Sequence, residues 1–527
     1  MQRRDLLKSA AALTLLGAPL APLRAIAPAA GAQTAGASTF DYARVKGMAR
    51  ALAAERYRIP PATLPREIKE LNWDDYQAIS FREDRALWAG EPARFRAKFF
   101  HLGLFYQEPV RIFEVTEGRA REIGYDRRMF DYGKGRLRNA RLPANLGFAG
   151  FRLSFQTDWA RDVTAFLGAS YFRAVGGEMQ YGLSARALAI DTGMSRPEEF
   201  PRFTTFWLER PAENADNVVI YALLDSPSTT GAYRFDIHPG ATLTMDIDAA
   251  LYPRKEIERL GIAPLTSMYL HGENDRRMAN DWRPELHDSD GLSMLSGRGE
   301  WIWRPLTNPS VVGFNAYGDE NPRGFGLIQR DRNFDHYQDD GVFYERRPSV
   351  WVEPKAGWGK GSVQLVELPT LDETNDNIVT FWNPEARPQP GQETLFGYRL
   401  HWGSRMPASP PLATVVATRT GIGGIIGRKR AYISWRFAVD FAGGDFAMLG
   451  KDARVEPVIS VSRGEIEITS ARPLQSINGY RATFDYKPAD SSTQPVTLRL
   501  YLRANGQPLT ETWIYEWIAW DHRLPPT

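Results

Sequence analysis

Cysteine is absent from all 527 residues, which excludes thiol nucleophiles, thiolate metal sites and disulfide scaffolds. The seven histidines include no His-Glu-x-x-His pair of the kind that binds zinc in metalloproteases. A Gly-x-Ser-x-Gly nucleophile elbow is missing as well. We therefore predict no metal and no cofactor, and we look for chemistry that carboxylates can perform.

Long hydrophobic runs are missing beyond the N-terminus, where none approaches the roughly 20 apolar residues of a membrane helix. The start of the chain is different. Arg3 and Arg4 precede an apolar run over residues 10–23, and Ala30-Gly31-Ala32 forms a small-x-small cleavage pattern. We read residues 1–32 as a twin-arginine export signal and expect the periplasm as destination. An ordinary secretion signal or a basic amphipathic arm is the alternative.

An excess of either charge is missing from the predicted mature chain. Removing residues 1–32 takes away four bases and one acid, which leaves 61 bases against 62 acids. A nearly neutral surface argues against nucleic acid or an anionic membrane as a partner. We also expect a protein that does not span the membrane.

What is present is mainly the pattern of β-strands. Residues 40–57 carry apolar side chains at helical spacing, but most later segments are short alternating or β-branched runs between turns rich in Gly, Pro, Asn and Asp. Strands are predicted at 110–115, 217–224, 241–247, 361–368, 378–382, 431–439, 458–462, 465–469, 480–486, 496–502 and 511–519. The fold class is therefore mainly β, with many antiparallel strands.

Two proline-dense segments, 384–390 and 405–411, suggest a domain boundary. We place a large β-sandwich domain at residues 33–404 and a smaller domain at 412–527. The smaller part has the length and strand spacing of an immunoglobulin-like β-sandwich. The larger part is too long for one ordinary sandwich, so an extended one is expected.

Carboxylates, arginines and tryptophans are interleaved between Glu273 and Trp382. Sugars offer apolar ring faces and many hydroxyls, so a glycan cleft needs aromatic platforms with polar groups at their edges. The alternatives are tryptophans in the core and surface ion pairs. Glycoside hydrolysis needs two poised acids, and the candidates lie in two turns, Asp288 with Asp290 and Asp372-Glu373 with Asp376. Each aspartate could instead simply form its turn.

Several longer motifs stand out along the chain. They are Phe-Leu-Gly-Ala-Ser-Tyr-Phe at 166–172, Tyr-Gly-Leu-Ser-Ala-Arg at 181–186, His-Asp-Ser-Asp-Gly-Leu at 287–292, Gly-Glu-Trp-Ile-Trp-Arg-Pro-Leu at 299–306, Gly-Phe-Gly-Leu-Ile-Gln-Arg-Asp-Arg at 324–332, Arg-Pro-Ser-Val-Trp at 347–351 and Asp-Glu-Thr-Asn-Asp-Asn-Ile-Val at 372–379. These motifs resemble the periplasmic glucan biosynthesis proteins of the G and D types, and the twin-arginine signal favours the D type. The resemblance spans the chain from Phe40 to the C-terminus.

This resemblance implies a large sandwich resembling galactose mutarotase joined to an immunoglobulin-like β-sandwich. It further implies action on the linear β-1,2-glucan backbone of osmoregulated periplasmic glucans. The activity would be that of an inverting endo-β-1,2-glucanase or of a related transglycosylase that transfers or cyclises the cut chain. The alternative is a non-catalytic glucan-binding or assembly protein that works with a membrane glucan synthase.

The resemblance also suggests roles for particular residues. Asp376 matches the general acid, and we expect burial to keep it protonated near neutral pH. For the general base we favour Asp288 over Asp290. Because they lie in or near these motifs, we also predict a set of substrate-binding residues. They are Trp301, Trp303, Arg304, Tyr344, Arg347, Trp351, Trp358, Glu373 and Asp290.

Two further expectations concern the substrate. Alternation in Glu-Trp-Ile-Trp-Arg sends Trp301 and Trp303 to one face of a strand, either as a sugar platform or as core. The loop 418–430 combines four glycines and three isoleucines with the basic run Arg428-Lys429-Arg430. We predict that it closes over the cleft as a lid, with domain-interface packing as the alternative.

Overall fold

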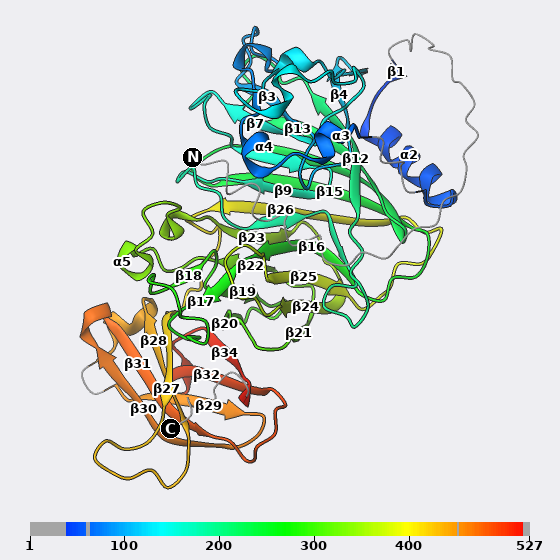
Figure 1. The fold of residues 1–527 in the computed structure, drawn as a ribbon. Helices are drawn as coiled ribbons and strands as arrows, with labels where there is room; N and C mark the ends of the chain where they lie inside the picture. Colours follow the sequence, from blue (N-terminus) through cyan, green and yellow to red (C-terminus); the bar gives the residue numbers. More distant parts are fainter. Residues whose placement is uncertain (1–37, 59–63, 451–452, 520–527) are drawn as a thin grey trace.

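The computed structural model describes residues 38–58, 64–450 and 453–519 (Figure 1). The predicted export signal at 1–32 lies outside these ranges. The mainly β class is confirmed, because strands make up most of the regular structure. Over the described ranges, no helix is both long enough and apolar enough to cross a membrane.

Two large sheets form the body of the molecule. The first has the strand order β1-β5-β4-β12-β13-β14-β15-β26-β23-β22-β19-β20-β34-β32-β29, with β33 beside β32. Its strands are β1 Ser38–Thr39, β5 Arg119–Glu122, β4 Arg111–Thr116, β12 Arg202–Glu209, β13 Val218–Asp225, β14 Thr229–His238, β15 Leu243–Pro253, β26 Thr394–Gly403, β23 Ser349–Pro354, β22 Gly324–Ile328, β19 Gly291–Leu295, β20 Trp301–Pro305, β34 Thr512–Trp517, β32 Val496–Ala504, β29 Val455–Val461 and β33 Gln507–Pro508.

The second sheet has the order β21-β24-β25-β16-β10-β9-β8-β7-β3, with β11 beside β16. Its strands are β21 Gly313–Glu320, β24 Lys360–Glu367, β25 Ile378–Pro384, β16 Leu260–Ser267, β10 Ser184–Arg186, β9 Tyr171–Ala174, β8 Thr164–Leu167, β7 Gly150–Phe155, β3 Phe95–Phe100 and β11 Leu188–Ile190. Smaller pairs are β17 Tyr269–His271 with β18 Leu286–His287, and β2 Ser80–Phe81 with β6 Phe130–Asp131.

The main core lies between the two large sheets. Phe166 and Phe172 of the second sheet contact Phe235 of the first, with ring centroids 5.1 and 5.3 Å apart. Because side chains alternate along a strand, Tyr171 and Arg173 point away from this core when Phe172 points into it. The outer face of the second sheet therefore carries polar side chains, and the candidate site lies there.

The helices are few and short. The helix predicted over 40–57 runs as α2 from Tyr42 to Ala54, capped by the Asp41 carboxylate, which accepts from the Arg44 backbone N–H at 2.7 Å. Its side chains Val45 and Ala49 are buried against the first sheet. The others are α3 Arg66–Lys69, α4 Trp73–Gln77 and α5 Phe334–Tyr337, with 3₁₀ turns η2 Glu83–Arg85, η3 Arg127–Met129, η4 Arg136–Asn139, η5 Tyr344–Arg346, η6 Gly444–Met448 and η7 Gln475–Ile477.

After β26 the chain crosses to a smaller two-layer unit at the other end of the molecule (Figure 1). One layer is the sheet β27-β28-β31-β30, made of β27 Thr414–Ile422, β28 Trp435–Ala442, β31 Gly479–Lys487 and β30 Glu465–Leu474. The other layer is β34-β32-β29, which continues the first large sheet because β34 pairs in parallel with β20. One sheet therefore runs through both parts. We call the part from β27 to β34 the smaller domain and the part up to β26 the large domain. The division at 404/412 stays a prediction.

Candidate functional site

Asp376 lies in the loop between β24 and β25, as predicted for a carboxylate between two strands. Its neighbour Asn377 is buried and holds the loop in place. The Asn377 side-chain amide donates to the carbonyls of Leu368 and Tyr269, both at 3.0 Å, and its oxygen accepts from the Tyr269 backbone N–H at 2.8 Å. The Asp376 side chain, only 9% exposed, is thereby fixed at the edge of the second sheet.

Two arginines on the outer face of that sheet surround Asp376. The Arg173 Nη2 lies 4.0 Å from the Asp376 Oδ2, and Arg173 Nε donates to Ser184 Oγ at 2.6 Å. Arg186 and Tyr171 also interact electrostatically with Asp376: burial raises the pKa of Tyr171, and the carboxylate raises it further. Nearby guanidinium groups favour the ionised form of a carboxyl, whereas burial disfavours it.

Asp288 follows β18 and is 4% exposed. It forms a contact ion pair with Arg347, whose guanidinium lies 4.1 Å from the centre of the Tyr344 ring. The Tyr344 hydroxyl donates to Glu373 Oε2 at 2.6 Å, and Arg283 donates to the same oxygen at 2.9 Å. The structure thus brings together four predicted residues, because these contacts link Glu373 to Asp288.

One stretch of backbone, Ser267–Tyr269, separates the two candidate acids. On one side, Ser267 pairs with Ile378, two residues after Asp376. On the other side, the Asp288 backbone N–H donates to the Met268 carbonyl at 2.8 Å. Neighbouring strands lie about 4.8 Å apart, so the backbones carrying the two aspartates are roughly 10 Å apart.

Asp290 has a different environment from Asp288. Its Oδ2 accepts hydrogen bonds from the backbone N–H groups of Arg330 and Asp331. Ser289, the residue between Asp288 and Asp290, has its Oγ 2.9 Å from Ser267 Oγ. Burial raises the pKa of Asp290 to about 6, although His287 opposes this. The side chain of Asp290 therefore binds the loop that follows β22, toward the smaller domain.

A buried group of acids lies beside Asp290 at the contact with the smaller domain. Burial, together with the charge of Glu285, raises the pKa of Glu273 to about 8, and Glu273 Oε1 accepts from the Thr418 backbone N–H at 3.0 Å. His287 Nε2 is 3.0 Å from Glu285 Oε2. Burial disfavours charge on His287, but Glu285 and Asp290 outweigh it and raise its pKa to about 9. Glu273, His287 and Asp290 border a cavity of about 30 Å³, which has room for little more than a water molecule.

Comparison with known proteins shows which family the chain belongs to. The family model described as periplasmic glucan biosynthesis protein, MdoG, matches residues 40–517. The chain belongs to this family. Relatives called Glucans biosynthesis protein D are 63% identical over 522 residues in Xanthomonas campestris pv. campestris (strain ATCC 33913) and 60% identical over 521 residues in Stenotrophomonas maltophilia (strain K279a). In both cases, 98% of each chain is covered. The resemblance stated from the motifs is therefore confirmed.

Among solved structures, the Slr1438 protein from Synechocystis sp. PCC 6803 has a TM-score of 0.15 and 8% identity, over 49% of this chain and 88% of that one. That likeness is too weak to carry an argument about the fold.

The predicted tryptophan platforms are buried where the two domains meet. Trp301, Trp303 and Trp351 are 9%, 3% and 2% exposed, and all belong to the core that the smaller domain shares with β20. The rings of Trp301 and Trp351 stack 5.5 Å apart, and the Arg330 guanidinium lies 3.6 Å from the Trp303 ring. Alternation along β20 was predicted correctly, but the shared face packs against protein. These rings have little surface left for a sugar.

Two other predicted binding residues also make internal contacts. Arg304 is fully buried and pairs with Glu367 at 2.8 Å. Trp358 is half-buried, with its ring 6.2 Å from that of Trp382. Trp351 and Trp358 therefore pack against the cores, and the side chains found beside Asp376 are arginines.

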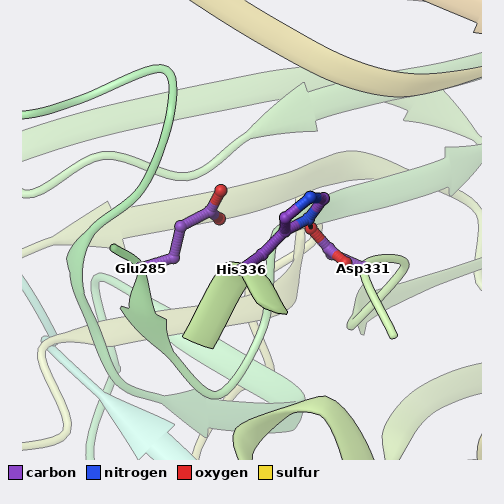
Figure 2. Close-up of side chains that lie close together, drawn as sticks. All are labelled: Glu285, Asp331 and His336. Carbon is purple, nitrogen blue, oxygen red and sulfur yellow. Dashed lines mark hydrogen bonds and ion pairs between the residues drawn. The ribbon is translucent and has the colours of Figure 1, made fainter. Parts of the chain in front are cut away.

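One group of residues has the side chains to hold a metal ion, as judged over the described ranges. Ligand atoms of Glu285, Asp331 and His336 lie within 4.8 Å of one another (Figure 2). Imidazole with two carboxylates suits several divalent transition metals. Each residue also has a partner in the protein, since His336 Nδ1 contacts Asp331 Oδ2 and Glu285 contacts His287. The expectation of no metal stays a prediction.

Residues 418–422 of the predicted loop belong to β27 and contact the large domain, where Thr418 donates to Glu273 and Thr420 donates to the Asn274 carbonyl, both at 3.0 Å. The rest of the loop binds its own domain in this structure. The Gly424 backbone N–H donates to Asp485 Oδ2 at 2.7 Å, and Arg430 Nε donates to the Gly423 carbonyl at 2.7 Å. Ile426 at its tip is 98% exposed. Closure over the cleft therefore stays a prediction, and Ile426 does not pack at the domain interface within one chain.

Sequence reasoning missed the outer-face residues Arg173 and Arg186 as neighbours of the acid, and it missed Arg283. Arg186 closes the Tyr-Gly-Leu-Ser-Ala-Arg motif, and Arg173 follows the Phe-Leu-Gly-Ala-Ser-Tyr-Phe motif. For Arg173, the position next to the inward-facing Phe172 was the available signal. It does not reveal which distant loop the charge will meet.

Proposed function

We propose that this chain is a periplasmic enzyme that cleaves or transfers linear β-1,2-glucan, with Asp376 as general acid and Asp288 as general base. The family and its glucan biosynthesis proteins support the substrate class. The observation that carries the proposal is the pair of largely buried aspartates on either side of Ser267–Tyr269. The backbones that carry them are roughly 10 Å apart, a spacing from which the side chains can reach the roughly 6.5 to 9.5 Å between carboxyl groups that inverting glycosidases use.

The different partners of the two aspartates support the division of roles. Asp288 touches Arg347 directly, and a contact ion pair keeps a carboxylate ionised and ready to accept a proton. Asp376 is largely buried, and burial favours the protonated form of a carboxyl. The ion pair with Arg347 favours Asp288 as the base, which leaves Asp376 to carry the proton to a leaving oxygen.

In the proposed reaction, Asp376 protonates the glycosidic oxygen as the bond from that oxygen to the anomeric carbon breaks. An acceptor hydroxyl attacks the same carbon from the opposite face, and Asp288 takes the acceptor's proton. Water as acceptor gives hydrolysis with inversion, whereas a sugar hydroxyl gives transfer or ring closure. Arg173 and Arg186 then stabilise the Asp376 carboxylate that remains.

The test is incubation of the purified protein with linear β-1,2-glucan, with products followed by mass spectrometry and their linkages by NMR. Shortened or cyclised chains are expected from the wild type. Asp376→Asn should lower the rate by about 10²- to 10⁴-fold, the usual contribution of general acid catalysis. The matched control is Asp372→Asn, since Asp372 is exposed in the same loop and its oxygen accepts only a local turn hydrogen bond from Thr374 at 2.8 Å.

A non-catalytic glucan-binding protein would give the opposite outcome. Glucan would then be bound but recovered at its original length from every variant, the wild type included. Wild-type turnover retained by a folded Asp376→Asn variant would instead refute the assignment of the acid.

A further inference from the structure

An open groove lies on the large domain, away from the smaller one. It has a volume of about 700 Å³ and is bordered by Lys69 and Leu71, by the loop Leu104–Glu108 and by Phe200 with Arg202. This volume falls within the roughly 300 to 1,000 Å³ of pockets that bind small organic ligands. The groove lies outside the pair of aspartates and their arginine partners.

Two aromatic rings at this groove are exposed to solvent. Phe105 is 41% exposed and Phe200 is 36% exposed, whereas most large aromatic side chains of this domain are buried. Tyr106 is buried and lines the groove as well. Exposed rings gathered in a concave place are typical of a binding surface rather than of scattered surface residues.

The polar groups at the groove favour a neutral ligand rich in hydroxyls. Arg202 and Glu108 pair with each other, so among the described residues that line the groove, Lys69 alone adds net charge. A strongly charged ligand would find little to neutralise it there. A sugar ring suits the groove, because it offers an apolar face to phenylalanine and hydroxyls to the polar rim.

The groove connects with the surroundings of Asp376 through a single side chain. The Arg186 guanidinium lies 5.6 Å from the centre of the Phe200 ring and 4.8 Å from that of Tyr171. Both Arg186 and Tyr171 interact electrostatically with Asp376. A chain bound at the candidate acid could therefore extend over Arg186 to Phe200.

We propose that this groove binds glucose units of the β-1,2-glucan chain away from the bond that is cut, with Phe105 and Phe200 as platforms. The proposal rests on the proposed function, because it takes the same substrate. It predicts that long chains gain affinity from the groove, while short chains that reach only the surroundings of Asp376 do not.

The experiment measures the affinity of a short and a long linear β-1,2-gluco-oligosaccharide by calorimetry. Asp376→Asn is the background, so that the ligand stays intact. Phe105→Ala and Phe200→Ala should each weaken long-chain binding by about two- to tenfold, the worth of one aromatic contact, and leave short-chain binding unchanged. Both rings are more than a third exposed, so both variants should fold.

Phe314→Ala is the matched control. Phe314 is 39% exposed, and its ring lies 4.0 Å from the Arg259 guanidinium, but it belongs to β21 at the other edge of the sheet. Unchanged long-chain affinity in both groove variants would overturn the inference, as would an equal loss in Phe314→Ala. If the wild type cleaves glucan in either case, the proposed function stands. If no glucan is bound or cut, both fail.

Discussion

Tyr344 connects Glu373 to the ion pair of Asp288: its hydroxyl donates to Glu373 Oε2 at 2.6 Å, and its ring lies 4.1 Å from the Arg347 guanidinium. The loop between β24 and β25, which carries both Glu373 and Asp376, is therefore linked through Tyr344 to Arg347, the ion-pair partner of the proposed base. The geometry of the two proposed catalytic residues should therefore depend on the hydroxyl of Tyr344.

Tyr344→Phe keeps the ring beneath Arg347 and removes the bond to Glu373. Turnover on β-1,2-glucan should fall by about tenfold, the worth of a hydrogen bond to a charged group. Tyr432→Phe is the control, because Tyr432 donates to Glu467 at the same 2.6 Å on the smaller domain. Equal turnover in the two variants would show that the hydroxyl of Tyr344 does not position the site.

Trp351→Ala should lower stability rather than substrate affinity. Trp351 is 2% exposed and stacks on Trp301, and truncating a buried tryptophan costs about 3–5 kcal/mol. The thermal midpoint should drop clearly while the folded protein binds glucan as before. Trp282→Ala should leave the midpoint unchanged, because Trp282 is 71% exposed. Weakened binding at an unchanged midpoint would restore Trp351 as a sugar platform.

The buried acids predict that stability falls as pH rises. The pKa of Glu273 is raised from 4.5 to about 8, so between these values the folded chain keeps a proton that the unfolded chain has lost. The stability that this proton confers is present below the unfolded value and is lost as pH passes about 8. His287, raised from 6.5 to about 9, acts in the same direction. The lowered pKa of Glu285 acts oppositely, with stability lost in acid.

Glu273→Gln should flatten this dependence between pH 5 and about 8, as measured by the thermal midpoint at several pH values. Glutamine keeps the shape and the acceptor oxygen for Thr418 but cannot ionise. Glu385→Gln is the control, since Glu385 is exposed. A wild-type midpoint that rises over this range, or an unaltered slope in Glu273→Gln, would contradict the assignment.

Shortening the loop between Ile422 and Ser434 tests the predicted lid. The hydrogen bonds of Gly423 and Gly424 to Ser434 and Asp485 lie at its base, so a variant that lacks only residues 425–429 should fold normally. We expect strongly reduced activity or a changed product mixture, because a lid excludes water and orders the acceptor. An unchanged rate with unchanged products would eliminate the lid.

Local patterns in the sequence predicted much of the fold. The strand expected at 361–368 runs from Lys360 to Glu367, and the one at 378–382 runs from Ile378 to Pro384. Alternation and turn residues determine such elements, and both are local signals. The loop that carries Asp376 between them was predicted for the same reason.

Long-range pairing explains what the sequence could not reveal. Trp301 and Trp303 do share a face of β20, but that face packs into the core of the smaller domain. That domain is joined to β20 by β34, which places Trp513 beside Trp303 from 210 positions later in the chain. Arg173 lies near Asp376 for a similar reason. The sheet order β25-β16-β10-β9 brings segments that are about 200 residues apart in sequence to the same part of one sheet. No spacing along the chain encodes these neighbours.

The central claim is that Asp288 and Asp376 act as a pair, and a double-mutant cycle on turnover of linear β-1,2-glucan tests it most directly. Asp288→Asn and Asp376→Asn should each lower the rate by about 10²-fold or more. The double variant should be little worse than the worse single one, because residues that act as a unit are not additive. Full turnover in either folded single variant, or losses that simply multiply in the double variant, would contradict the account.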